Sequence, residues 1–80
     1  MKVYIKQRDS YECQNPDCII EVPKRLDVHH IDYNKKNSDI NNLITLCINC
    51  HIKTNTQSKR NFNTEFYQNI MLNKMMDCLL

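Results

Sequence analysis

The chain has 80 residues, no glycine, five cysteines and a formal net charge of +2. That length predicts a single domain, residues 1–80, whose thin core needs the support of disulfides or a metal. No apolar run approaches the roughly 20 residues of a membrane span, and the N-terminus lacks the apolar segment of a signal peptide, which predicts no membrane partner and a cytoplasmic location. In that reducing compartment, clustered cysteines indicate metal ligands.

The first half of the chain contains one predicted strand. Residues 1–10 form a short amphipathic segment, for which helix and strand are both open. Residues 13–18, CQNPDC, predict a tight turn because Asn-Pro favours turn initiation. Residues 25–31, RLDVHHI, predict a strand because β-branched residues favour extended backbone. Residues 32–42 are rich in turn formers and predict a polar loop.

A second strand and a short helix are predicted next. The segment LITLC, residues 43–47, has the apolar, β-branched composition of a strand. Residues 48–57 predict a short helix whose first turn contains Cys50 and His51. The two strands would then return the chain antiparallel and bring His51 toward the first strand.

An amphipathic helix is predicted at about residues 63–79, with Asn63 or Thr64 as its cap. We expect its apolar face to cover the core of the domain, and a face for a homodimer or a partner protein is the alternative. The apolar residues recur at spacings of three and four: Phe66, Tyr67, Ile70, Met71, Met75, Cys78 and Leu79.

Four of the cysteines form two closely spaced pairs, Cys13-x4-Cys18 and Cys47-x2-Cys50. Each pair can present two thiolates from one turn, so the four predict a tetrahedral structural zinc site. Metal binding would then be part of folding, as a chain this small requires. Unrelated buried or paired cysteines are the alternative, and Cys78 is expected to be a small core residue.

A closed site of four thiolates has no open coordination position, which leaves the three histidines for another task. Two of them, His29 and His30, are adjacent in the first strand, and the third is His51. Side chains that are adjacent in a strand face opposite sides, so the pair can divide two tasks if the strand ends or bends there. The alternative for the pair is that one histidine is structural and the other is exposed on the surface. A second alternative is that His30 or His51 replaces one of the cysteines as a zinc ligand.

Together, LDVHHID and DINNLITLCINCH resemble the motif of the HNH endonuclease family, in the branch braced by a four-cysteine zinc site. The resemblance covers residues 8–55 and extends loosely into the C-terminal helix. It implies a small α+β fold with a ββα-metal core at residues 8–58. It also implies metal-dependent hydrolysis of DNA phosphodiesters, by nicking or double-strand cleavage. A phage or mobile-element setting, and thus a bacterial or phage-infected cell, is typical of small relatives.

The resemblance also implies a role for each candidate active-site residue. His29 and His51 correspond to the ligands of the catalytic metal, and His30 corresponds to the general base that takes a proton from water. Asn42 corresponds to the asparagine that ties the loop back to the strand and fixes the base. Mg²⁺ or Mn²⁺ is the expected ion. Many relatives carry aspartate in place of His29, so Ni²⁺ or Zn²⁺ can compete.

Basic residues form two patches that suit a phosphate backbone, and solubilising surface charge is the alternative. The candidates for DNA contact are Arg8, Lys35, Lys36, Lys53, Lys59 and Arg60. An ion pair of Arg8 with Asp9 or Glu12 would exclude it from that role. Asp27 shares a strand face with His29, and we expect a solvated acid there rather than an outer partner of the metal.

Three other functions fit parts of this pattern. A non-catalytic zinc module that binds DNA or a protein would keep the fold, but it would not need all three histidines and the asparagine. A nuclease module of a larger complex is compatible with the short chain. A redox or zinc-storage protein would need the cysteines alone.

Overall fold

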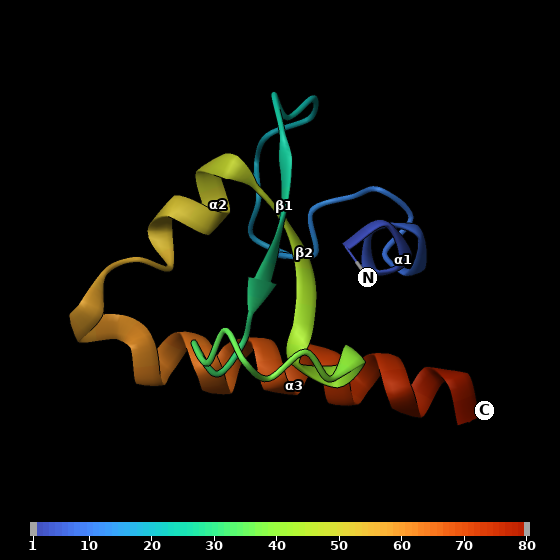
Figure 1. Ribbon diagram of the computed structural model, residues 1–80. Helices are drawn as coiled ribbons and strands as arrows, with labels where there is room; N and C mark the ends of the chain where they lie inside the picture. The colour runs from blue at the N-terminus through green and yellow to red at the C-terminus, as the bar shows by residue number, and fades with distance from the viewer. Residues whose placement is uncertain (1, 80) are drawn as a thin grey trace.

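The computed structural model describes residues 2–79, with side chains through Lys74. It has an α+β architecture in which a two-stranded sheet is covered by helices (Figure 1). Short 3-10 turns at Ile40–Asn42 and Gln57–Lys59 precede β2 and α3. The regular elements are helix α1 (Lys2–Arg8), strand β1 (Leu26–His30), strand β2 (Leu43–Cys47), helix α2 (Ile48–Lys53) and helix α3 (Arg60–Leu79).

The two strands pair antiparallel, and their register sets the position of the histidines. His29 lies opposite Ile44, and His30, the last residue of β1, lies opposite Leu43. Every residue of β2 is buried, whereas only His29 is buried in β1. The apolar, β-branched sequence of β2 therefore forms the centre of the fold, and β1 is the less buried of the two strands.

The core joins the sheet to the cysteine pairs and to α3. Of the amphipathic stripe predicted in α3, Tyr67 and Met71 are buried, and Phe66 and Ile70 pack against the same cluster. This part of the stripe is used within the domain, as expected for core cover. Met75, Cys78 and Leu79 lie outside the described side chains. The buried members of the cluster are Ile31, Ile44, Leu46, Cys47, Cys50, Tyr67 and Met71.

Helix α3 begins at Arg60, so the predicted start at residue 63 is wrong. The turn Gln57–Lys59 runs directly into the helix. Thr64 is therefore inside α3, and its hydroxyl donates a hydrogen bond to the carbonyl of Ile31, 3.0 Å away.

The N-terminal segment, for which the sequence left helix and strand open, contains helix α1. Among the described residues, no helix is long and apolar enough to cross a membrane.

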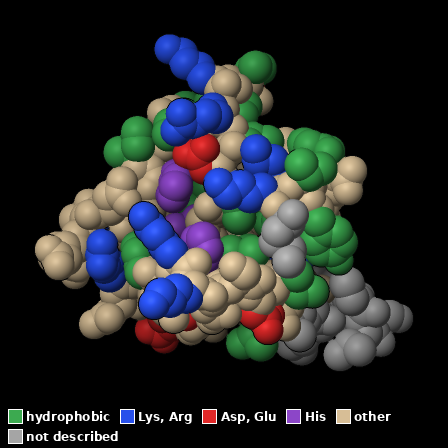
Figure 2. Space-filling view, viewed as in Figure 1, with side chains coloured by type: hydrophobic (Ala, Val, Ile, Leu, Met, Phe, Trp, Pro, Cys, Tyr) green, Lys and Arg blue, Asp and Glu red, His purple; other side chains and the backbone are tan. Residues whose placement is uncertain are grey.

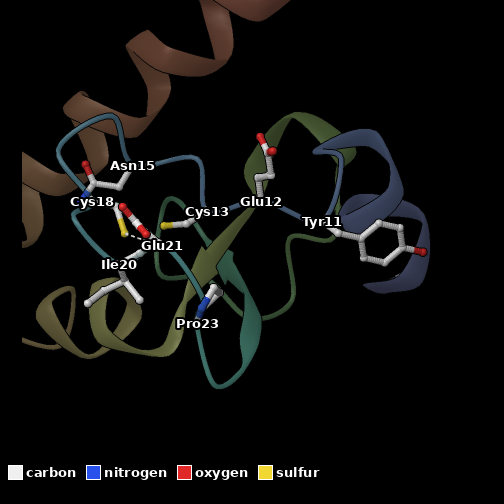
Figure 3. Close-up of a pocket in the computed structure, with 8 residues that line it drawn as sticks. All are labelled: Tyr11, Glu12, Cys13, Asn15, Cys18, Ile20, Glu21 and Pro23. Atoms are coloured by element: carbon white, nitrogen blue, oxygen red, sulfur yellow. Dashed lines mark hydrogen bonds between the residues drawn. The ribbon is translucent and has the colours of Figure 1, made fainter.

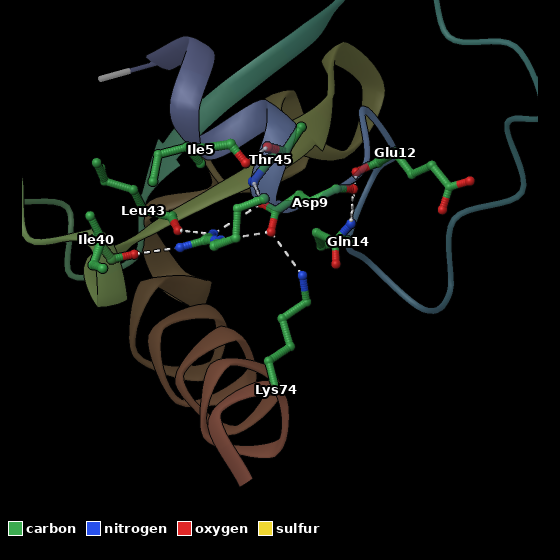
Figure 4. A network of polar contacts seen from close by, with 9 residues as sticks. Ile5, Asp9, Glu12, Gln14, Ile40, Leu43, Thr45 and Lys74 are labelled. Carbon is green, nitrogen blue, oxygen red and sulfur yellow. Dashed lines mark hydrogen bonds and ion pairs between the residues drawn. The ribbon is translucent and has the colours of Figure 1, made fainter. Parts of the chain in front are cut away.

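A buried carboxylate ties α1, β2 and α3 together (Figure 4). Asp9 is 2% exposed and accepts hydrogen bonds from Arg8, from Lys74 at 2.8 Å and from the backbone N–H of Thr45 at 2.9 Å. Burial acts to raise the pKa of Asp9, but these hydrogen bonds outweigh it and hold the pKa below its ordinary value. Asp9 therefore stays ionised and links segments that are far apart in the sequence.

Arg8 belongs to this network, which is the alternative to its expected contact with DNA. Its guanidinium contacts both carboxylate oxygens of Asp9, at 2.9 and 3.0 Å, and donates to the carbonyls of Ile40 and Leu43, each at 2.6 Å. Four of its five N–H groups are used in this way. The ion pair with Asp9, which was the alternative, is the observed state of Arg8.

Candidate active site

The four paired cysteines meet at one point. The sulfur atoms of Cys13, Cys18, Cys47 and Cys50 all lie within 4.8 Å of one another, and those of Cys18 and Cys47 are 3.6 Å apart. In a tetrahedral zinc site with Zn–S bonds of about 2.3 Å, neighbouring sulfur atoms are roughly 3.8 Å apart. No disulfide joins these four cysteines. They could therefore hold a structural metal such as zinc.

Local structure brings each cysteine pair to this point. The backbone N–H of Cys18 donates to the carbonyl of Asn15, which closes the predicted tight turn, and the Asn15 amide donates to the sulfur of Cys50 at 3.4 Å. Cys47 ends β2 and Cys50 lies in the first turn of α2. Figure 3 shows Cys13 and Cys18 turning their sulfur atoms inward from this turn. Burial raises the pKa of the thiols of Cys13 and Cys50, and a bound cation would offset that effect.

The three histidines line one cavity of about 420 Å³, and none of the four cysteines lines it. His29 and His30 come from the end of β1, and His51 comes from α2. The rings of His29 and His51 have centroids 5.4 Å apart. In the space-filling view, the histidine side chains lie in a hollow that has Lys and Arg side chains on several sides (Figure 2). Neighbouring residues of β1 can share this cavity because the strand ends at His30 and the chain then turns.

His29 is buried and has a nitrogen without a partner. The residue is 4% exposed, and its Nε2 atom has no hydrogen-bond partner among the side chains and backbone that the structure describes. Burial, with smaller contributions from His51 and His30, lowers the pKa of His29 to about 4. The ring is therefore neutral at neutral pH, which is the protonation state in which histidine binds metals.

His51 is held by Asp27, which we had expected to be a solvated acid. The Nδ1 atom of His51 lies 2.9 Å from an Asp27 carboxylate oxygen, and both carboxylate oxygens also accept from Arg25. Burial acts to raise the pKa of Asp27, but the hydrogen bonds from Arg25 and His51 lower it below its ordinary value. The ionised carboxylate can only accept, so Nδ1 of His51 carries a proton, and in the neutral tautomer that this contact selects the lone pair is on Nε2.

Asn42 fixes the turn that follows His30. Its side-chain amide donates to the carboxylate of Asp32 at 2.9 Å and to the carbonyl of Asn37 at 3.0 Å. Its side-chain oxygen accepts from the N–H of Asp32, and its backbone carbonyl accepts from the N–H of Ile31 at 2.8 Å. The buried Asn42 side chain thus holds both ends of the loop between the strands, and its hydrogen bonds go to Asp32 and Asn37.

Residues 12–57 match the family model described as HNH endonuclease. The chain belongs to the HNH endonuclease family. Neither the search of curated proteins nor the search of solved structures gave a significant match. Membership indicates a nuclease or another nucleic-acid-related function, and the two-stranded sheet followed by α2 fits the ββα core of an HNH domain.

The basic residues predicted to contact DNA do not all line the same cavity of this HNH domain. Lys35 and Arg60 line the histidine cavity, together with Lys2, which the sequence did not indicate. Lys53 and Lys59 line a different hollow between α2 and α3. Lys36 lines neither of these two cavities. Lys2 belongs to the cavity because α1 lies against the sheet, a contact for which the sequence contains no local signal.

Aromatic rings form the wall behind His29 in the HNH domain. The ring of Tyr33 is 5.1 Å from that of His29 and that of Tyr67 is 5.9 Å away, measured between centroids. The Tyr33 hydroxyl donates to the carbonyl of Thr54 at 2.9 Å, which fixes its position. The guanidinium carbon of Arg60 lies 4.8 Å from the centre of the Tyr33 ring, a cation–π distance. Tyr33 therefore supports a histidine on one side and a cation on the other.

Proposed function

We propose that the chain is a metal-dependent endonuclease that hydrolyses phosphodiester bonds in DNA. The observation that supports this best is the common cavity of His29, His30 and His51, next to a separate four-cysteine site. Because the cysteines account for a structural metal, the histidines are available for a second ion and for proton transfer.

The histidine pair His29 and His51 fits a divalent ion. Two imidazoles that bind one ion through nitrogen atoms about 2.1 Å from it place their centroids roughly 5 Å apart, and the observed separation is 5.4 Å. The unpartnered Nε2 of His29 and the free lone pair of His51 are the two candidate donor atoms. A divalent ion bound there supplies a Lewis acid that stabilises the charge developing on the phosphate and the leaving oxygen.

His30 is our proposed general base. It lines the same cavity as the two candidate ligands but is not part of the Asp27–His51 contact, so its ring is free to accept a proton from water. Asn42 would act indirectly, because it holds the turn that begins directly after His30. In this arrangement each of the adjacent histidines has a separate task.

The charges around the cavity suit a DNA backbone. Lys2, Lys35 and Arg60 line it with the histidines, and the cation–π contact with Tyr33 restricts where Arg60 can go. Such contacts position the phosphate chain without reading base sequence. Mg²⁺ or Mn²⁺ is the proposed ion for catalysis, and the nitrogen donors also admit Ni²⁺ or Zn²⁺.

The experiment is cleavage of supercoiled plasmid by zinc-loaded protein in a panel of divalent metals. We expect nicked or linear product with Mg²⁺ or Mn²⁺ and none without added metal. The matched variant is His30→Ala, which should keep its zinc and lose cleavage. Absence of cleavage by the wild-type protein with every metal would favour the non-catalytic zinc module.

A further inference from the structure

A second hollow, of about 290 Å³, lies between α2 and the start of α3 and is not part of the histidine cavity. Its floor includes Cys50 and Tyr67, which belong to the core cluster. The walls combine aromatic and basic side chains. The residues used below are Lys53, Lys59, Phe62, Asn63 and Phe66.

One wall of this hollow is an exposed aromatic pair. The rings of Phe62 and Phe66 are nearly parallel, with an interplanar angle of 15° and centroids 5.9 Å apart. Phe66 packs against the core, whereas Phe62 is 66% exposed at the mouth of the hollow. An aromatic ring that is held in place from below and open above can accept another flat ring on its free side.

Two basic side chains are available to an anion beside that ring. Lys53 and Lys59 are both exposed and line it, against one acid, the exposed Asp17. Thr56 and Asn63 add hydrogen-bonding groups at the same wall. An exposed aromatic ring with flanking lysines is the combination that binds single-stranded nucleic acids, by base stacking and phosphate attraction.

The hollow is also adjacent to the cavity of the histidines along the chain. Within the connection between α2 and α3, Asn55 and Arg60 line the histidine cavity, while Thr56 and Lys59 line the second hollow. The same short segment therefore borders both.

We propose that this second hollow binds an unpaired nucleotide of a single DNA strand. Its base stacks on Phe62, and its phosphates lie against Lys53 and Lys59. The inference rests on the proposed function for the choice of DNA, and it assigns the protein a preference for substrates with an unpaired segment beside the cleavage point.

The test uses the absence of tryptophan from the chain. Phe62→Trp keeps an aromatic ring at the wall and introduces a single fluorescent reporter. Titration of this zinc-loaded variant, without Mg²⁺ or Mn²⁺, with an oligonucleotide of about ten unpaired nucleotides should quench its emission strongly, because a base stacks on the indole. Leu72→Trp, at an exposed position further along α3, is the matched control and should change little.

Affinity gives a second measurement. Phe62→Ala should bind the same oligonucleotide at least about fivefold more weakly than the wild type, and Phe62→Trp should bind it as the wild type does. Blunt duplex DNA should distinguish the variants much less. Equal quenching of Phe62→Trp and Leu72→Trp overturns the proposal, as does a change of Phe62→Trp emission with protein concentration alone, which would indicate a second copy in the hollow.

These readouts are independent of catalysis. Specific quenching of Phe62→Trp in a protein that cleaves no DNA supports the second hollow and contradicts the proposed nuclease. Plasmid cleavage by the wild type, without specific quenching of Phe62→Trp, supports the nuclease and overturns the hollow as a nucleotide site.

Discussion

The Nδ1 atom of His51 in helix α2 donates a hydrogen bond to the carboxylate of Asp27 in strand β1, across 2.9 Å. The two residues are 24 positions apart in the sequence, and the chain reversal through β2 brings them together. A carboxylate behind a histidine fixes its tautomer and the direction of its other nitrogen. Asp27 is thus a positioning residue for the proposed metal site.

Replacing Asp27 should weaken the proposed catalytic metal site without abolishing the fold. Asp27→Ala removes the acceptor from His51, and such a change typically costs about 10–100-fold in metal affinity or activity. We expect calorimetric titration of the zinc-loaded protein with Mn²⁺ or Ni²⁺ to show a loss of this size. Arg25→Ala is the control, since Arg25 is mostly exposed and contacts Asp27 but not His51. Equal effects of the two substitutions would contradict the positioning role.

His30→Ala should lower the rate of plasmid cleavage about 10²–10⁴-fold, because no other residue is proposed to take the proton from water. The variant should keep one zinc per chain and the thermal melting curve of the wild type, since His30 makes no side-chain hydrogen bond among those the structure shows. The zinc content and the melting curve should be measured on the same preparation as the cleavage rate. Cleavage at the wild-type rate would remove His30 from the role of general base.

Cys47→Ser should lose zinc and the folded state together. Cys47 is fully buried, joins β2 to the cysteine cluster and packs in the core cluster. Since zinc binding and folding of such a small domain are coupled, circular dichroism should show loss of structure in this variant, and in wild-type protein treated with a chelator. A Cys47→Ser protein that stays folded without zinc would show that the metal is not the support of the fold.

Arg60 and Lys36 should differ in their effect on cleavage, although both were candidates for DNA contact. Arg60 lines the histidine cavity and rests on Tyr33, whereas Lys36 is exposed and lines no part of that cavity. Arg60→Ala should raise the substrate concentration needed for half-maximal cleavage by about fivefold or more and reduce the dependence of binding on salt. Lys36→Ala should leave both near wild type. A larger effect of Lys36→Ala than of Arg60→Ala would indicate that DNA binds outside the histidine cavity.

Asp9→Ala should lower the free energy of unfolding by about 2–4 kcal/mol. The change leaves the N–H of Thr45 buried without an acceptor and separates Arg8 and Lys74 from their shared counter-charge. Urea denaturation of the zinc-loaded protein measures this. Asp9→Asn should lose less, because its amide oxygen can still accept from Thr45. Glu12→Ala, at an exposed position, should change stability by no more than about 0.5 kcal/mol.

Much of the local structure could be predicted from the sequence. The second strand was predicted at residues 43–47 and β2 is Leu43–Cys47, while the first was predicted at 25–31 and β1 is Leu26–His30. Composition decides these segments, because β-branched and apolar residues cluster in them. The start of α3 could not be predicted in this way. Thr64 has the chemistry of a cap, but it lies inside α3, where its hydroxyl donates to the carbonyl of Ile31.

The sequence by itself determined the two cysteine pairs, the histidine pair and the two strands, because these depend on spacing and composition within single turns or strands. The class of fold followed from the resemblance of the combined motif to the HNH family. Only the tertiary structure decided which charges act together. Arg8 is committed to Asp9 and to carbonyls on β2 and the preceding turn, while Lys2 reaches the histidine cavity. Contacts between residues far apart in the chain depend on how helices lie against the sheet, and no local pattern encodes that.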